Sequence, residues 1–218
     1  GFDSTGAITI AVPASATNTG GAKASVVVIN DPALRNHKTK TASVYADYNV
    51  EYLTNTARYT LEYADATALH LVYEEVGTPA STTVNGAVTD STLIVVVDGS
   101  NITAGDLVLV SGISKPVYVI SRDNKNVTVS SAVTLTDTAT ITFPTIKDHT
   151  SKFVFDDGTR DAYYDLPSIT RVANISATAI ADTTALKIKY DYYAHGGTGD
   201  YFSVDSYSNV EYPEIPTY

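Results

Sequence analysis

Apolar and polar residues alternate over many short stretches, and this alternation is the feature that most restricts how the chain can fold. Residues 7–12 (AITIAV), 58–63 (RYTLEY) and 138–143 (TATITF) all follow it. A two-residue period places successive side chains on opposite faces of a β-strand. Turn-forming pairs such as Asp157-Gly158 separate the segments. Many short strands joined by turns are typical of sandwiches and barrels, so we predict an all-β chain.

The same period predicts further strands along the chain. They lie at residues 25–29, 69–76, 107–110, 117–120, 126–130, 152–155, 169–172, 185–193 and 201–204. Residues 64–76 also have the propensity for a helix. We favour a strand there, because Leu69, Leu71 and Tyr73 recur at every second position.

The distribution of tyrosine suggests how the strands are grouped. Of the 16 tyrosines only Tyr118 lies within residues 80–146, whereas both flanks are rich in them. We predict an antiparallel β-sandwich host domain built from residues 1–79 and 147–218. A small β-barrel-like module, residues 80–146, is inserted into it. Insertions at loops are tolerated because loop-closure entropy rises slowly with length. Three consecutive β domains are the alternative.

Composition narrows the classes of function. The net charge is −10, and an acidic surface repels nucleic-acid phosphates. Cysteine is absent, so disulfides and thiolate metal sites are excluded. The longest apolar run, residues 93–97, is too short to span a membrane. Because position 1 is not methionine, we expect a fragment or processed product of a longer protein.

Motifs for catalysis are missing from the sequence. There is no G-x-S-x-G elbow, no H-E-x-x-H pair and no phosphate-binding loop. His195 precedes Gly196-Gly197. A histidine that forms a hydrogen bond with the backbone of a turn is a simpler interpretation of this position than a catalytic base. We therefore expect no enzymatic activity and no cofactor.

An acidic turn follows the strand predicted at residues 152–155. Asp156, Asp157 and Asp161 could supply oxygen ligands to a structural calcium ion. Arg160 lies within the same turn, and arginine forms bidentate pairs with carboxylates. We therefore favour a turn lock made by Asp157, Arg160 and Asp161 over a calcium site.

Aromatic residues are concentrated near the C-terminus. Glycines at residues 196–199 suit a tight link between strands, so we expect the segments on either side to be antiparallel neighbours. Their aromatic side chains would pair across the strands. The predicted core or interface anchors are Tyr164, Tyr192, Tyr201, Phe202 and Tyr207.

Three segments carry a resemblance to a known group of proteins. ALHLVYEEV, FVFDDGTRDAYYD and YDYYAHGGTGDYFSVDSY resemble segments of large virion structural proteins of contractile-tailed bacteriophages, including those that infect cyanobacteria. The resemblance covers the C-terminal third and the region of residues 59–76. The matching positions are Phe155, Asp157, Gly158, Arg160, Asp161, Tyr164, Asp165, Asp191, Tyr192, His195, Gly197, Gly199, Asp200, Tyr201, Phe202, Val204, Asp205, Ser206, Tyr207, Tyr212, Ile215 and Pro216.

The resemblance implies a non-enzymatic structural protein of the virion, in the tail or baseplate, that acts through contacts between subunits. Its partners would be copies of itself or other virion proteins, with no nucleic acid and no membrane. The alternative is a carbohydrate-binding or adhesin-type β-sandwich module that contacts a host-surface glycan, since tyrosine rings also stack on sugars.

Overall fold

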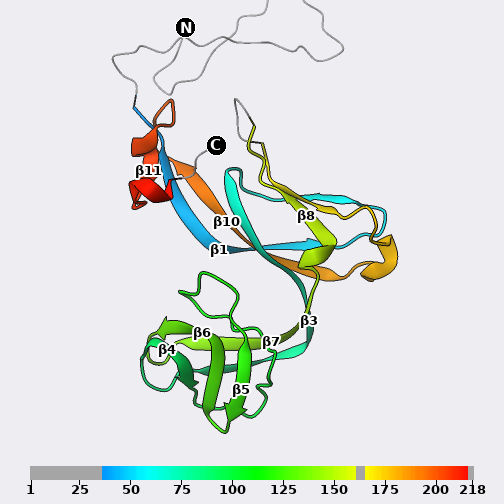
Figure 1. Cartoon of the computed structure of the whole chain (residues 1–218), viewed down its shortest axis with the longest axis vertical. Coiled ribbons are helices and arrows are strands. Elements are labelled where there is room, and N and C mark those ends of the chain that lie inside the picture. Colours follow the sequence, from blue (N-terminus) through cyan, green and yellow to red (C-terminus); the bar gives the residue numbers. More distant parts are fainter. Residues whose placement is uncertain (1–35, 161–164, 216–218) are drawn as a thin grey trace, which may run out of the picture. The chain divides into compact units, whose positions relative to one another are not determined.

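A computed structural model describes residues 36–160 and 165–215 (Figure 1). The chain divides into two compact units, Gly1–Arg35 and Asn36–Tyr218, and every described residue belongs to the second. The strands predicted at residues 7–12 and 25–29 lie outside the described part, as do Asp161 and Tyr164.

The all-β prediction is confirmed. The strands are β1 (Thr39–Glu51), β2 (Arg58–Thr60), β3 (Ala66–Thr83), β4 (Val88–Val95), β5 (Val119–Asp123), β6 (Asn126–Leu135), β7 (Thr140–Asp148), β8 (Phe153–Asp156), β9 (Ser168–Arg171), β10 (Ala185–Gly196) and β11 (Tyr207–Ser208). Single 3₁₀ turns lie between some of them, at Thr150–Lys152, Ala177–Ala179 and Val204–Ser206, and another follows β11 at Tyr212–Glu214. The ambiguous segment at residues 64–76 is a strand from Ala66 onward, as the alternation predicted.

Two sheets enclose a tyrosine-containing core, which we call the host core. One sheet has the order β11-β1-β10-β3-β7, and the other has the order β2-β9-β8. Side chains from both sheets meet between them, as in a β-sandwich. The buried members are Tyr52, Tyr59, Leu61, Ala66, Val72, Phe153, Ile169, Ile180, Leu186, Ile188 and Tyr190.

A second core, which we call the module core, lies within residues 84–143. The sheet β4-β6-β5 and the distal parts of β3 and β7 surround it. Its buried members are Val84, Val88, Ile94, Val96, Ile102, Val108, Val117, Val119, Val127, Val129, Val133, Leu135, Ile141 and Phe143. The strong β propensity of branched residues explains why this segment forms strands with only one aromatic residue in its core, Phe143.

Strands β3 and β7 link the two cores. They pair from Tyr73 opposite Asp148 to Thr83 opposite Thr140, with an irregularity between Val76 and Ala80 (Figure 1). Both strands run across the boundaries predicted at residues 79/80 and 146/147. Neither strand ends at a predicted boundary, and the division into a host domain and an inserted module stays a prediction.

The C-terminal return differs from the prediction. Residues 201–204 are not a strand antiparallel to β10. Instead, Tyr201 bridges His37 and β11 pairs with Lys40 and Thr41, both in parallel. β1, which the alternation did not predict, lies between β10 and β11. A side chain at Gly199 would collide with the backbone of Asn36 and His37, so this glycine permits the close approach.

Candidate functional site

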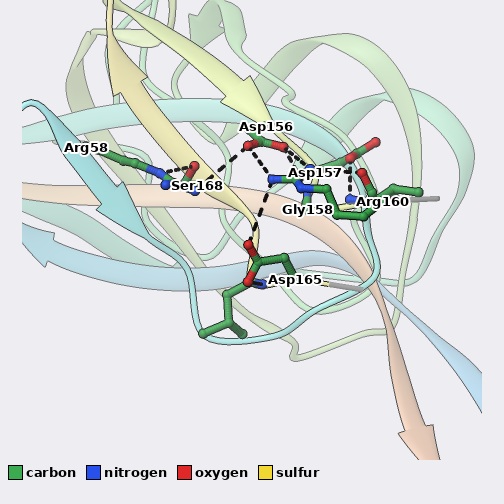
Figure 2. A network of polar contacts seen from close by, with 9 residues as sticks. Arg58, Asp156, Asp157, Gly158, Arg160, Asp165 and Ser168 are labelled. Carbon is green, nitrogen blue, oxygen red and sulfur yellow. Dashed lines mark hydrogen bonds and ion pairs between the residues drawn. The ribbon is translucent and has the colours of Figure 1, made fainter. Parts of the chain in front are cut away.

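The predicted turn lock is an ion-pair cluster that follows β8 (Figure 2). The Arg160 guanidinium donates to both oxygens of Asp156, at 3.0 and 2.9 Å. It also donates to the Thr159 carbonyl at 2.9 Å and lies 3.9 Å from Asp165 Oδ2. Arg58 approaches Asp156 at 3.9 Å from the neighbouring strand β2. Arg160 thus ties the two arms of the turn to the end of β8.

The bidentate partner of Arg160 is Asp156, whereas the sequence favoured Asp157. Asp157 Oδ1 accepts a hydrogen bond from the Thr159 N–H at 2.8 Å, which is an Asx turn. The two aspartates are adjacent, and the sequence does not distinguish which of them pairs with the arginine. Asp161, the third predicted member, lies outside the described residues.

Gly158 fixes the shape of this turn. Its φ is 81°, and a Cβ there would collide with the Asp165 carbonyl. The Gly158 carbonyl accepts a hydrogen bond from the Asp165 N–H at 2.8 Å. The hydrogen bonds from Arg160 lower the pKa of Asp156 most, and the hydrogen bond from the Gly158 N–H lowers it further. The side chains of Arg160 and Asp156 are 33% and 41% exposed, so solvent screens the pair.

A more deeply buried polar cluster lies on the five-stranded sheet, and sequence reasoning did not find it. Lys40 Nζ is 2.8 Å from Asp65 Oδ2, and these side chains are 1% and 0% exposed. His195 Nε2 contacts the same carboxylate oxygen at 2.8 Å. Lys40 and His195 are directly opposite in the β1–β10 ladder, which brings them together. Only tertiary pairing unites these three residues.

Two predicted aromatic anchors cover this buried cluster. Lys40 Nζ lies 4.9 Å from the ring centre of Phe202 and 4.8 Å from that of Tyr207. It also donates to the Tyr207 hydroxyl at 3.1 Å. Such cation–π contacts strengthen when the cation is desolvated. Phe202 and Tyr207 therefore complete the environment of a buried ammonium group.

The other predicted aromatic residues have different surroundings. Tyr192 stacks on Tyr63, with ring centres 4.5 Å apart and planes 5° apart, and it borders the host core. Tyr201 is 44% exposed and contributes the backbone bridge to His37. Tyr164 lies outside the described residues.

A third polar cluster lies directly after the end of β7. His149 is buried, and its Nδ1 is 2.9 Å from Lys152 Nζ, while its Nε2 is 3.3 Å from Glu74 Oε2. Burial lowers the pKa of His149 and outweighs the opposing hydrogen bond from Glu74. Lys152 also donates to the Ala179 carbonyl at 3.1 Å. The arrangement fastens a loop to the sheet.

Within residues 36–160 and 165–215, no group of three or more histidine, aspartate or glutamate side chains is arranged to hold a metal ion. The calcium alternative also depended on Asp161, which is not described. No helix among the described residues is long and apolar enough to cross a membrane.

Comparison with protein-family models, with curated proteins and with solved structures found no match. The case for any particular class of protein therefore depends on the motif residues and on what they do in the fold.

Proposed function

We propose that the chain is a non-enzymatic structural part of a phage virion, in the tail or baseplate, and that it works by contacts with neighbouring subunits. The observation that carries the proposal is the structural role of the residues on which the resemblance to tail proteins depends. Several of those that the structure describes hold backbone segments together.

Both motifs supply such tie points. In the first, Gly158 and Arg160 shape and fasten the turn after β8. In the second, Asp191 Oδ1 accepts a hydrogen bond from the Tyr45 N–H at 2.6 Å, and His195 contacts buried Asp65. A motif whose polar groups are engaged in this way specifies a shape, which is what a building block of an assembly requires.

The surface also has features that suit contacts between subunits. Tyr63, Tyr201 and Tyr212 are exposed, and tyrosine is enriched at protein interfaces because it is apolar with one polar end. Among the described residues, β11 covers the outer edge of β1 only at Lys40 and Thr41. A strand edge of this kind can accept a strand from another chain.

Mass spectrometry of purified particles tests the proposal. Trypsin cleaves after Lys152 and Arg160, which releases the diagnostic peptide FVFDDGTR. Tailed particles should be purified through a density gradient from a culture that carries this sequence. We expect the peptide to co-sediment with known particle proteins. If it is found only in the particle-free fraction, while those proteins are detected in the particles, the proposal is wrong.

A further inference from the structure

The buried polar cluster on the five-stranded sheet holds an amine and a carboxyl group in contact and away from water. Lys40 Nζ is 2.8 Å from Asp65 Oδ2, and the two side chains are 1% and 0% exposed. Groups that react within one molecule are held with the reacting atoms about 3–3.5 Å apart, and this contact brings the nitrogen into that range of the carboxyl group. Lysine and aspartic acid can condense to an amide with loss of water, so the pair has the chemistry for an internal cross-link.

The Asp65 backbone is fixed in a constrained conformation at this contact. Asp65 directly precedes β3 and has a φ of 59°. A positive φ is uncommon for a residue with a side chain, and such conformations cluster at functional sites. The Asp65 carbonyl accepts a hydrogen bond from the Tyr193 N–H of β10 at 3.0 Å. A carboxyl group on a backbone held in this way has little freedom left to lose when it reacts.

His195 supplies the third group that a condensation needs. Its Nε2 lies 2.8 Å from the same Asp65 oxygen, and its side chain is 29% exposed. An imidazole can accept a proton from one group and donate it to another near neutral pH. His195 therefore connects the buried carboxyl group with solvent and can carry a proton between the amine and the leaving oxygen.

Aromatic rings help to exclude water from the pair. Lys40 Nζ lies 4.9 Å from the ring centre of Phe202 and 4.8 Å from that of Tyr207. The Phe202 ring also contacts the His195 ring, with centres 4.5 Å apart. Without water, an ammonium and a carboxylate lose the hydration that stabilises the separate charges. One proton passed from Lys40 to Asp65 gives the neutral amine and the neutral acid, which are the forms that condense.

A second lysine–aspartate pair shows that a short distance is not sufficient. Lys189 Nζ lies 2.6 Å from Asp47 Oδ1, which is closer than the contact between Lys40 and Asp65. Asp47 is 62% exposed, and both residues line a pocket of about 350 Å³ beside Tyr45. Water can hydrate this carboxylate, so we expect the second pair to remain an ion pair.

We propose that Lys40 and Asp65 join in an intramolecular amide bond, with His195 as the proton carrier. The Lys40 nitrogen attacks the Asp65 carboxyl carbon with its electron pair and forms the C–N bond. His195 accepts a proton from that nitrogen and delivers it to the hydroxyl group of the acid. The C–O bond then breaks and the hydroxyl leaves as water, so the atoms balance without an oxidant or a second substrate.

The amide would tie together strands that do not all pair directly. In the sheet, β10 lies between β1, which carries Lys40, and β3, which directly follows Asp65. A bond that crosses β10 would hold β1 in the sheet. It would also add to the stability that the buried pair provides by itself, because a cross-link restricts the unfolded chain. Such a cross-link suits an assembly role but does not depend on one.

Mass spectrometry of the purified full chain, after denaturation, tests the bond. We expect a mass lower by one water molecule than the sequence requires. Trypsin should no longer cleave after Lys40, and residues 39–58 should be joined to the peptide that begins at Tyr59 and contains Asp65. The full mass of the sequence would overturn the proposal, because Lys40 and Asp65 would then form an ion pair only. A link between Lys189 and Asp47 in its place would overturn the assignment of the site.

Lys40→Arg separates this bond from loss of water elsewhere in the chain. Arginine keeps a cation beside Asp65 but lacks the primary amine, so the variant should have the full mass of its sequence. If Lys40→Arg also lacked one water molecule, the dehydration would belong to another site and the proposal would be wrong.

Two histidine variants test the proton carrier. General acid–base catalysis contributes roughly 10²–10⁴-fold, so His195→Gln should slow the reaction about 100-fold or more. Uncross-linked chain should then be present directly after purification, with an unchanged circular dichroism spectrum. His149→Gln is the matched control, because His149 is also buried but contacts Lys152 and Glu74 instead. Equal cross-linked fractions in the two variants would exclude His195 as the proton carrier.

Discussion

The module core and the host core are stabilised in different ways. The module core is built from valine, isoleucine and leucine with a single phenylalanine, Phe143. The host core contains three buried tyrosines, Tyr52, Tyr59 and Tyr190. An aliphatic core depends on filled volume, whereas a core containing tyrosine also depends on the hydrogen bonds of its hydroxyl groups.

Two of the host tyrosines show what those hydroxyls do. The Tyr52 hydroxyl donates to the Ala177 carbonyl at 2.6 Å and accepts from Arg171 at 3.0 Å. The Tyr59 hydroxyl donates to the Leu53 carbonyl at 3.0 Å and accepts from the Leu53 N–H at 2.8 Å. Each ring packs in the core while its hydroxyl holds a loop, so a residue of the host core also fixes a connection.

Removing the buried cation of the host should have the largest effect. Lys40→Met leaves the Asp65 carboxylate buried, with His195 still in contact with it. We expect a loss of about 3 kcal/mol, the lower end for a broken buried pair, because His195 still contacts the carboxylate. Urea denaturation followed by tyrosine fluorescence measures it. Lys115→Met, at an exposed site in the module, is the control and should change stability by less than about 0.5 kcal/mol.

Two substitutions that each remove one heavy atom test whether the host core depends on hydroxyl hydrogen bonds and the module core on filled volume. Tyr52→Phe should cost about 1–3 kcal/mol, because it leaves buried polar groups without a partner. Ile94→Val removes one methylene from the module core and should cost about 0.5–1.5 kcal/mol. Circular dichroism during urea titration compares the two variants. If Tyr52→Phe cost less than Ile94→Val, the distinction between the cores would fail.

Acid should weaken the host through His149. The folded state holds the pKa of this histidine below its usual value. As the pH falls below about 6.5, the unfolded chain therefore takes up the proton first. The stability present at neutral pH should decline as the pH falls toward the lowered pKa of the folded state. Melting temperatures between pH 7.5 and 5.5 measure the decline, and His149→Gln should make it shallower. An identical pH profile for the variant would exclude His149 as a cause.

The turn lock should give the smallest effect. Arg160→Ala removes a bidentate pair, but both side chains are partly exposed, so we expect a loss below about 1 kcal/mol. Limited proteolysis offers a more sensitive measurement, since the variant should be cut faster near residues 157–165 than the parent. Arg58→Ala is a suitable comparison, because its contact with Asp156 is longer, at 3.9 Å. A loss of several kcal/mol would mean that the lock supports the whole host.

Much of the fold could be predicted from local pattern. The alternation located β3, β6, β8, β9 and β10, because a half-buried strand requires it. It missed β4 and also β1, in which Tyr45 interrupts the ladder with a positive φ. It also assigned a strand to residues 201–204, where Val204–Ser206 forms a 3₁₀ turn. There the Ser206 Oγ accepts from the Ser203 N–H at 2.9 Å, which favours the turn over an extended chain.

The candidate sites were less predictable. An arginine among aspartates indicated a lock, but its bidentate partner is Asp156, while Asp157 accepts from the Thr159 N–H. No motif in the local sequence marks Lys40, Asp65 or Lys189 as buried, although Lys40 stands between two threonines and the other two have apolar neighbours. Their burial follows from which strands become adjacent.

By itself, the sequence determined that the chain forms strands and where most of them lie. It also determined that the host is rich in tyrosine and the module in aliphatic residues. Those properties depend on the periodicity and propensity of neighbouring residues. The tertiary structure alone decided which charges are buried together, because Lys40, Asp65 and His195 meet only when β1, β10 and the start of β3 lie side by side. It likewise decided that a pocket forms beside Tyr45, because three segments far apart in the chain supply its walls.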